Sequence, residues 1–84
     1  MMEGNFWGRT ITASGACDDP VRYDKFGPFT PGFPLVPFND TAAIKKLFEQ
    51  DKNIAAIFLE PIQGERGVII PDQGYLNEVR RLCK

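Results

Sequence analysis

The sequence contains no histidine and only two cysteines, Cys17 and Cys83, among its 84 residues. Without histidine, the chain cannot form a Ser-His-Asp or Cys-His catalytic group by itself, and it cannot supply the histidine ligands of many zinc sites. Two cysteines do not make a disulfide framework, so we predict free thiols in a reducing compartment. Any chemistry of this chain must use carboxylates, arginine, lysine or a bound cofactor.

The sequence also lacks a long apolar run, a basic patch and the features of a signal peptide. A membrane span requires about 20 apolar residues in succession, and no run approaches that length. The net charge is −1, with Lys and Arg scattered along the chain, whereas a nucleic-acid footprint needs clustered basic residues. Residues 1–4 show neither the basic nor the apolar region of a signal peptide. We therefore expect neither a membrane nor a nucleic acid as a partner, and no bound metal.

Two helices are predicted in the second half of the chain. Residues 41–50 carry apolar side chains at helical spacing, at positions Ala43, Ile44, Leu47 and Phe48. Either of the two preceding residues, Asn39 and Asp40, can accept hydrogen bonds from the first turn. A second helix is predicted over about 74–83, with one face formed by Tyr75, Leu76, Val79 and Leu82.

Two strands are predicted around the first helix. "PLVPF" at 34–38 indicates a short strand at a sheet edge or strand end, because Pro37 has no N–H to donate. "IAAIFLE" at 54–60 is apolar for six residues without alternation, which is typical of a parallel strand buried on both faces. The order strand, helix, strand, helix predicts an α/β fold built on a right-handed βαβ unit.

Residues 11–33 are predicted to be irregular, because Gly and Pro interrupt both "GACDDP" and "FGPFTPGFP". The second stretch repeats Phe beside Gly or Pro, at Phe26, Phe29 and Phe33. Such a long aromatic loop either wraps the protein's own core or packs on a partner surface.

The chain is short for an independent α/β domain. For a chain of this size, the free energy gained by burying apolar surface is about equal to the entropy cost of ordering the residues. In addition, a βαβα pattern would next return to a strand. We therefore expect residues 1–84 to be part of a larger protein, truncated at both ends.

Candidate site residues lie at two places. Glu60 ends the second predicted strand and Glu65 follows within "EPIQGERG", and ligands of open α/β sheets gather beyond the carboxyl ends of strands. Near the start, Phe6 could cover a flat ring, and Arg9 could clamp a carboxylate through paired N–H groups. The alternatives are solvated loop charges for the two acids, or the carboxylate pair of a retaining glycosidase.

The segments "GNFWGRT", "FGPFTPGF", "PFND" and "EPIQGERGVIIPDQGYLNEVRRLC" together resemble the class-III pyridoxal-phosphate-dependent aminotransferases of fold type I. The resemblance extends from about residue 4 to residue 83. Trp7 between Phe6 and Gly8, with the aromatic loop, makes the chain most similar to members that act on ornithine. The resemblance implies that residues 1–84 belong to the large domain, which binds the cofactor pyridoxal 5'-phosphate (PLP).

The resemblance also implies roles for the candidate residues. Phe6 would stack on the pyridine ring of PLP, and Glu60 would line the cofactor pocket. Arg9 would bind the α-carboxylate of ornithine, so that the δ-amino group faces the cofactor. Glu65 would pair with an arginine that otherwise binds the α-carboxylate of glutamate, and opening this pair would let one site accept both substrates.

Several functional groups of the family have no counterpart in these residues. The family pattern places the Schiff-base lysine, the aspartate at the pyridine nitrogen and the arginine partner of Glu65 after residue 84, and the phosphate-binding segment before residue 1. The resemblance therefore implies no catalytic residue here and an inactive chain by itself. Arg66, where smaller residues are common, would either weaken the pairing of Glu65 or face solvent.

The parent enzyme implied by the resemblance is an ornithine–oxo-acid transaminase. It would convert L-ornithine and 2-oxoglutarate to glutamate 5-semialdehyde and L-glutamate, as a homodimer, in the mitochondrial matrix of a eukaryote or otherwise in the cytoplasm. Its partners would be these amino-acid and oxo-acid substrates and the remainder of the parent chain. Two alternatives are an acetylornithine or 4-aminobutyrate aminotransferase, and a truncated interaction module without catalysis.

Overall fold

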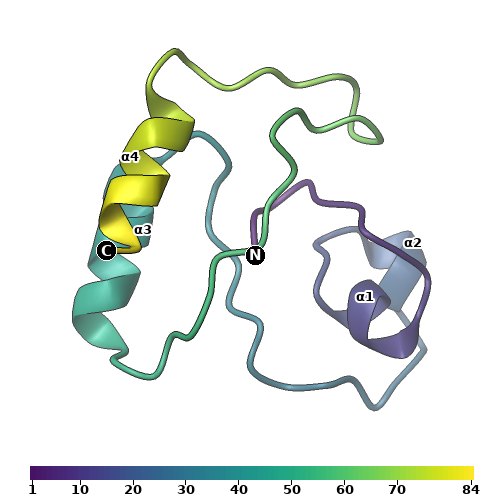
Figure 1. Cartoon of the computed structure of the whole chain (residues 1–84). Coiled ribbons are helices and arrows are strands. Elements are labelled where there is room, and N and C mark those ends of the chain that lie inside the picture. The colour runs from purple at the N-terminus through teal and green to yellow at the C-terminus, as the bar shows by residue number, and fades with distance from the viewer.

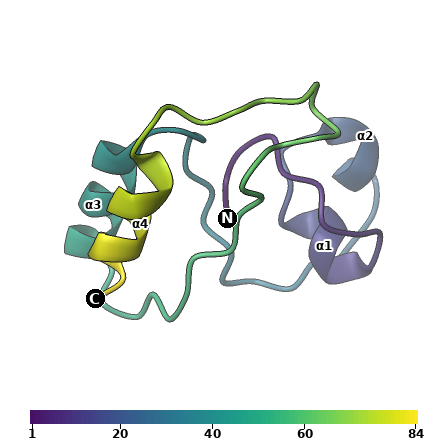
Figure 2. The ribbon, with the colours of Figure 1, turned by 45° about the horizontal axis from the view of Figure 1, so that its top comes forward.

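The computed structural model describes all residues, 1–84, as a thin body of 36 × 31 × 15 Å. Its helices are α1 (Ile11–Gly15), α2 (Pro20–Tyr23), α3 (Thr41–Gln50) and α4 (Tyr75–Leu82). Figures 1 and 2 show α3 beside α4 at one end and α1 beside α2 at the other, with extended chain and the N-terminus between them. A body this thin has little interior, so most side chains reach the surface.

Helix α3 forms where the sequence predicts it. The Asp40 carboxylate accepts a hydrogen bond from the Ala43 N–H at 3.0 Å and satisfies one free donor of the first turn. Ile44 is buried, and the other apolar residues of the predicted face pack against the core. The spacing and the capping signal both predicted this helix correctly.

Helix α4 also lies within its predicted range. Gly74 precedes it with φ +87°, a left-handed conformation that glycine adopts without a side-chain clash. Tyr75 and Val79 are buried, but Leu76 is 41% exposed, so the prediction for its side chain was wrong. Tyr75 and Val79 are four residues apart and share one face of the helix, whereas Leu76 projects about 100° away from Tyr75.

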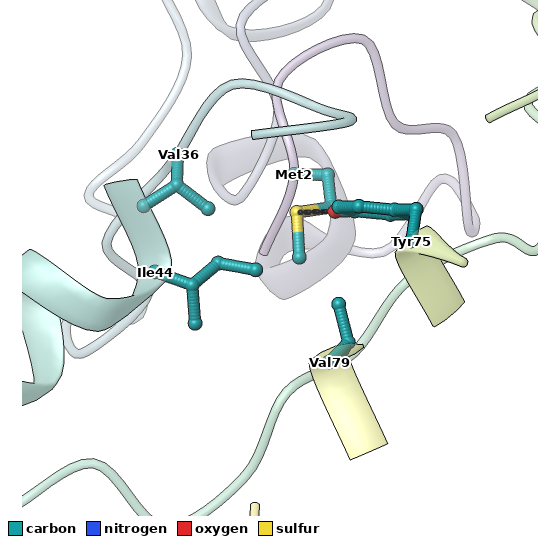
Figure 3. Packing of buried hydrophobic residues seen from close by; sticks show 5 residues of the cluster. All are labelled: Met2, Val36, Ile44, Tyr75 and Val79. Atoms are coloured by element: carbon teal, nitrogen blue, oxygen red, sulfur yellow. Dashed lines mark hydrogen bonds between the residues drawn. The ribbon is translucent and has the colours of Figure 1, made fainter. Parts of the chain in front are cut away.

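The core joins the N-terminus to the two longer helices. It consists of Met2, Val36, Ile44, Tyr75 and Val79 (Figure 3). The Tyr75 hydroxyl lies 3.5 Å from the Met2 sulfur, and its ring meets Phe38 edge-on at 5.4 Å. Burial raises the pKa of the Tyr75 hydroxyl above its ordinary value, because ionisation would place a charge in this apolar contact.

The two predicted strands are not formed as strands, and this part of the prediction was wrong. Val36 makes only an isolated parallel bridge to Met2, with the Val36 carbonyl accepting from Glu3 N–H at 2.8 Å. Residues 54–60 are extended but make no backbone–backbone hydrogen bond. A strand exists through pairing with a neighbour, and the backbone N–H and C=O groups of residues 54–60 have no such partner.

The expected burial of residues 54–60 on both faces is also not found. Ile57 and Leu59 pack against the core, whereas Ala56 and Phe58, which alternate with them, are exposed. Because side chains of an extended segment alternate between two faces, one face of this segment is covered and the other is open.

Two short helices interrupt the region predicted to be irregular. The Thr10 hydroxyl accepts from the Ala13 N–H at the start of α1. The Asp19 carboxylate accepts from the Val21 N–H at the start of α2, where Pro20 occupies the first helical position. Proline at that position favours a helix, so "DDP" starts one rather than preventing it.

The two sulfhydryls are free, as predicted, with Cys17 buried and Cys83 exposed. No helix is both long enough and apolar enough to cross a membrane. The aromatic loop is only partly packed: Phe26 is 67% exposed, while the Phe29 ring lies against Gly15 of α1. A Cβ at Gly15 would come within 2.6 Å of Phe29, so this contact depends on glycine.

Candidate functional site

The first candidate residues lie on a segment that is fixed by a buried asparagine. The Asn5 side-chain nitrogen donates to the carbonyl oxygens of Met2 and Ala16, both at 2.8 Å. Its side-chain oxygen is buried without a hydrogen-bond partner. These contacts fix the backbone immediately before Phe6, whose ring remains half-buried.

Glu60 and Phe6 are brought together from distant parts of the sequence. The Phe6 N–H donates to one oxygen of the Glu60 carboxylate at 2.7 Å, and the Gly64 N–H lies 3.4 Å from the other. A carboxylate that accepts backbone N–H groups makes strong charge-assisted hydrogen bonds. Glu60 therefore joins the segment that carries Phe6 to the loop that carries Glu65.

Glu65 lies in a tight turn. Gln63 and Ile69 form an antiparallel bridge, with N–O distances of 2.9 and 2.7 Å. The Gly67 N–H donates to the Gly64 carbonyl at 3.0 Å, and Gly67 has φ +105°. Residues 64–68 thus form the turn between the bridged residues, and the positive φ of Gly67 is one that glycine adopts without strain. The Glu65 side chain is 60% exposed.

Gln63 anchors this turn to the N-terminal segment and was not singled out from the sequence as a positioning residue. It is 1% exposed, and its amide nitrogen donates to the Glu3 carbonyl at 2.8 Å. Gly4 has φ +77°, and a Cβ there would lie 2.8 Å from the Gln63 side-chain oxygen. The close approach of these segments therefore requires glycine at position 4.

Arg22 is the main site residue that sequence reasoning missed. Its guanidinium carbon lies 4.3 Å from the centroid of the Phe6 ring. One terminal nitrogen is 3.8 Å from the Glu65 carboxylate, and the other donates to the Asn5 carbonyl at 3.4 Å. Its Nε lies 3.7 Å from Asp19. Only Asp19 is a local partner, and no sequence pattern marks Arg22, because Phe6, Asn5 and Glu65 lie in two distant segments.

Arg9 is the candidate that the structure does not bring to this cluster. It is exposed, lies just before the capping residue of α1, and has no hydrogen bond or ion pair within the chain. Arg66 also turns away from Glu65: its guanidinium bonds Asp18 at 2.8 Å, and Asp18 also accepts from the Gly4 N–H at 2.9 Å. Glu65 is therefore paired with Arg22 and not with its neighbour in sequence.

An apolar cavity lies on a different part of the molecule. It measures about 490 Å³ and its wall is mostly apolar, formed by the N-terminus, α3 and the segments 32–36 and 54–58. Trp7 and Phe58, whose ring centroids are 4.9 Å apart, stand at its border. Asp51 supplies its only charged side chain, so this cavity lacks the arginine and paired carboxylates that the candidate site contains. No group of three or more His, Cys, Asp or Glu side chains is placed to hold a metal.

Comparison with known proteins identifies the class. The family described as aminotransferase class-III matches residues 1–84. The chain belongs to the class-III aminotransferases, which confirms the resemblance found in its motifs.

Its relatives include ornithine aminotransferases. The mitochondrial enzyme of Rattus norvegicus is 58% identical over 80 residues, and the enzyme of Vigna aconitifolia is 57% identical over 81 residues. These alignments cover 95% and 96% of this chain but only 18% and 19% of the relatives. The chain thus spans less than a fifth of the length of either relative.

Solved structures give the same result. Two crystal structures of the ornithine aminotransferase of Toxoplasma gondii superpose with a TM-score of 0.93 and 48% sequence identity. Each match covers 98% of this chain and 19% of the T. gondii chain. In one of them, PLP partially occupies the active site.

Proposed function

We propose that these residues serve an ornithine–oxo-acid transaminase, which converts L-ornithine and 2-oxoglutarate to glutamate 5-semialdehyde and L-glutamate. The observation that carries the proposal is the similarity to ornithine aminotransferases along almost the entire chain, at 58% identity to the rat enzyme. The proposal is also supported by the cluster of candidate residues: Glu60 accepts a hydrogen bond from the backbone of Phe6, and Arg22 contacts both Phe6 and Glu65.

The residues present fit one side of a PLP site. Phe6 offers a half-exposed ring whose backbone is held by Glu60, and a flat aromatic ring suits stacking on a pyridine ring. PLP, when bound, supplies an electron sink for the amino-acid substrate. In this proposal Arg9 binds the α-carboxylate of ornithine and Glu65 influences which substrate carboxylate is accepted; the exposure of both side chains supports these roles.

The same proposal covers the fold, the assembly and the location. Residues 1–84 form part of a large PLP-binding α/β domain, in which further strands would pair with residues 54–60 and the whole enzyme would be a homodimer. The open backbone groups of 54–60 support this view. The rat and Caenorhabditis elegans relatives are named mitochondrial, which supports the mitochondrial matrix for a eukaryotic parent and the cytoplasm for a bacterial one.

A grafted enzyme tests the function. Residues 1–84 replace the matched segment of the rat ornithine aminotransferase, and the product is purified with PLP. We expect formation of glutamate 5-semialdehyde from ornithine and 2-oxoglutarate, and little turnover of acetylornithine or 4-aminobutyrate.

Two comparisons make this test decisive. The rat enzyme without the graft gives the reference rate, and Phe6→Ala in the graft removes the proposed stacking ring and should weaken PLP retention. A folded graft that holds PLP but prefers acetylornithine or 4-aminobutyrate would overturn the assignment to ornithine.

A further inference from the structure

Arg22 connects the proposed cofactor residue to the proposed substrate residue. Its guanidinium lies over the Phe6 ring at 4.3 Å and near the Glu65 carboxylate at 3.8 Å. The Arg22 side chain is only 22% exposed, whereas that of Glu65 is 60% exposed. A largely covered cation thus stands between an aromatic ring and an open carboxylate.

The contacts of Arg22 hold its guanidinium in one place. Asp19, three residues earlier, lies 3.7 Å from its Nε, and the Asn5 carbonyl accepts from its Nη1. Cation–π attraction to Phe6 adds a further restraint. Because the guanidinium is planar and always charged, it can stack on the ring and face Glu65 at the same time.

We propose that Arg22 is a positioning residue that sets the preference between cationic and anionic amino-acid substrates, an inference that rests on the proposed function. Ornithine carries two ammonium groups and one carboxylate, whereas glutamate carries one ammonium group and two carboxylates. Arg22 compensates the charge of Glu65. Without it, the uncompensated carboxylate disfavours glutamate relative to ornithine.

The test compares the two half-reactions in the grafted enzyme. Arg22→Gln should lower the rate constant with glutamate relative to that with ornithine by up to about fivefold, because a partly exposed charge pair is worth at most about 1 kcal/mol. Arg22→Lys keeps the charge and should restore at least half of this ratio. Glu65→Gln removes the carboxylate that Arg22 faces. In the Glu65→Gln enzyme, adding Arg22→Gln should therefore cause no further change in the ratio of the two rate constants.

Arg66→Gln is the matched control. It removes the same charge from an arginine in the same region, but Arg66 pairs with Asp18 and not with Glu65. We expect it to leave the ratio close to that of the unsubstituted graft. A shift as large as that of Arg22→Gln, or an equal loss in both half-reactions with Arg22→Gln, would overturn the role of Arg22.

A second readout needs no turnover. Thermal unfolding of the graft without PLP is measured for Arg22→Gln, Glu65→Gln and the double variant. If the two side chains interact, the double variant loses less stability than the two single variants lose when their losses are added. Strict additivity would overturn the proposed pairing even in an active enzyme. An unsubstituted graft that folds but does not use ornithine would instead count against the proposed function.

Discussion

Glu60 illustrates what a single residue reveals in sequence and what it does not. Its position at the end of an apolar segment predicted a site acid, and the resemblance placed it near the cofactor. Its observed partners are backbone N–H groups of Phe6 and Gly64. The Phe6 contact joins residues 54 positions apart, and no local pattern encodes such a pair. The role of Glu60 toward PLP stays a prediction.

Arg9 leads to a test of the substrate clamp. Its guanidinium is exposed and unpaired within the chain, which leaves it available to a substrate carboxylate. In the grafted enzyme, Arg9→Ala should slow the half-reaction with ornithine by tenfold or more, on the order of the loss of one charge-assisted contact, and affect glutamate much less. Stopped-flow absorbance of each half-reaction measures both rates.

Arg80→Ala serves as a control for this substitution, because Arg80 is exposed on α4 and belongs to no part of the candidate site. It should leave both rates unchanged. Equal losses with ornithine and glutamate in Arg9→Ala would show that the clamp is assigned to the wrong residue.

The helices and the extended segments differ in how well the sequence predicted them. Helices α3 and α4 form their hydrogen bonds between residues close in sequence, so helical spacing located both, and a capping residue marked the start of α3. The segment 54–60 has the composition of a strand, but its backbone groups need partners from another segment. The short helix α2 was missed because "DDP" was interpreted as an interruption, although Asp19 caps this helix and Pro20 begins it.

The capping of α3 can be tested directly. Asp40→Ala removes the acceptor of the Ala43 N–H and should destabilise the helix by about 1 kcal/mol. Circular dichroism of the 84-residue chain at 222 nm should show reduced helix content. Asp40→Asn retains an acceptor and should stay close to the unsubstituted chain. If the two variants lost the same amount of helix, charge rather than capping would be responsible.

The whole chain is a thin body with an open side. Its longest dimension is 36 Å and its shortest is 15 Å, and the cavity beside residues 54–58 is mostly apolar. Exposed Phe58 and unpaired backbone in the same segment indicate a surface that a larger protein would cover. This agrees with a chain that spans less than a fifth of its relatives.

The chain alone should lack a dedicated attachment site for PLP. Its five lysines are Lys25, Lys45, Lys46, Lys52 and Lys84, all of which are exposed. We expect incubation with PLP, followed by borohydride reduction and mass spectrometry of peptides, to show weak labelling spread over several lysines. Pyridoxamine 5'-phosphate, which has no aldehyde, is the control. Stoichiometric labelling of one lysine would refute the absence of a catalytic lysine here.

The sequence by itself determined the family, the two longer helices and the free thiols, because motifs, helical spacing and cysteine number are properties of the sequence alone. Only the tertiary structure decided that Phe6 meets Glu60, that Arg22 rather than Arg66 faces Glu65, and that Arg9 stands apart. It also decided that residues 54–60 stay unpaired. These outcomes depend on which segments come into contact in the folded chain. A contact between residues far apart in the sequence leaves no periodic pattern that a single sequence could reveal.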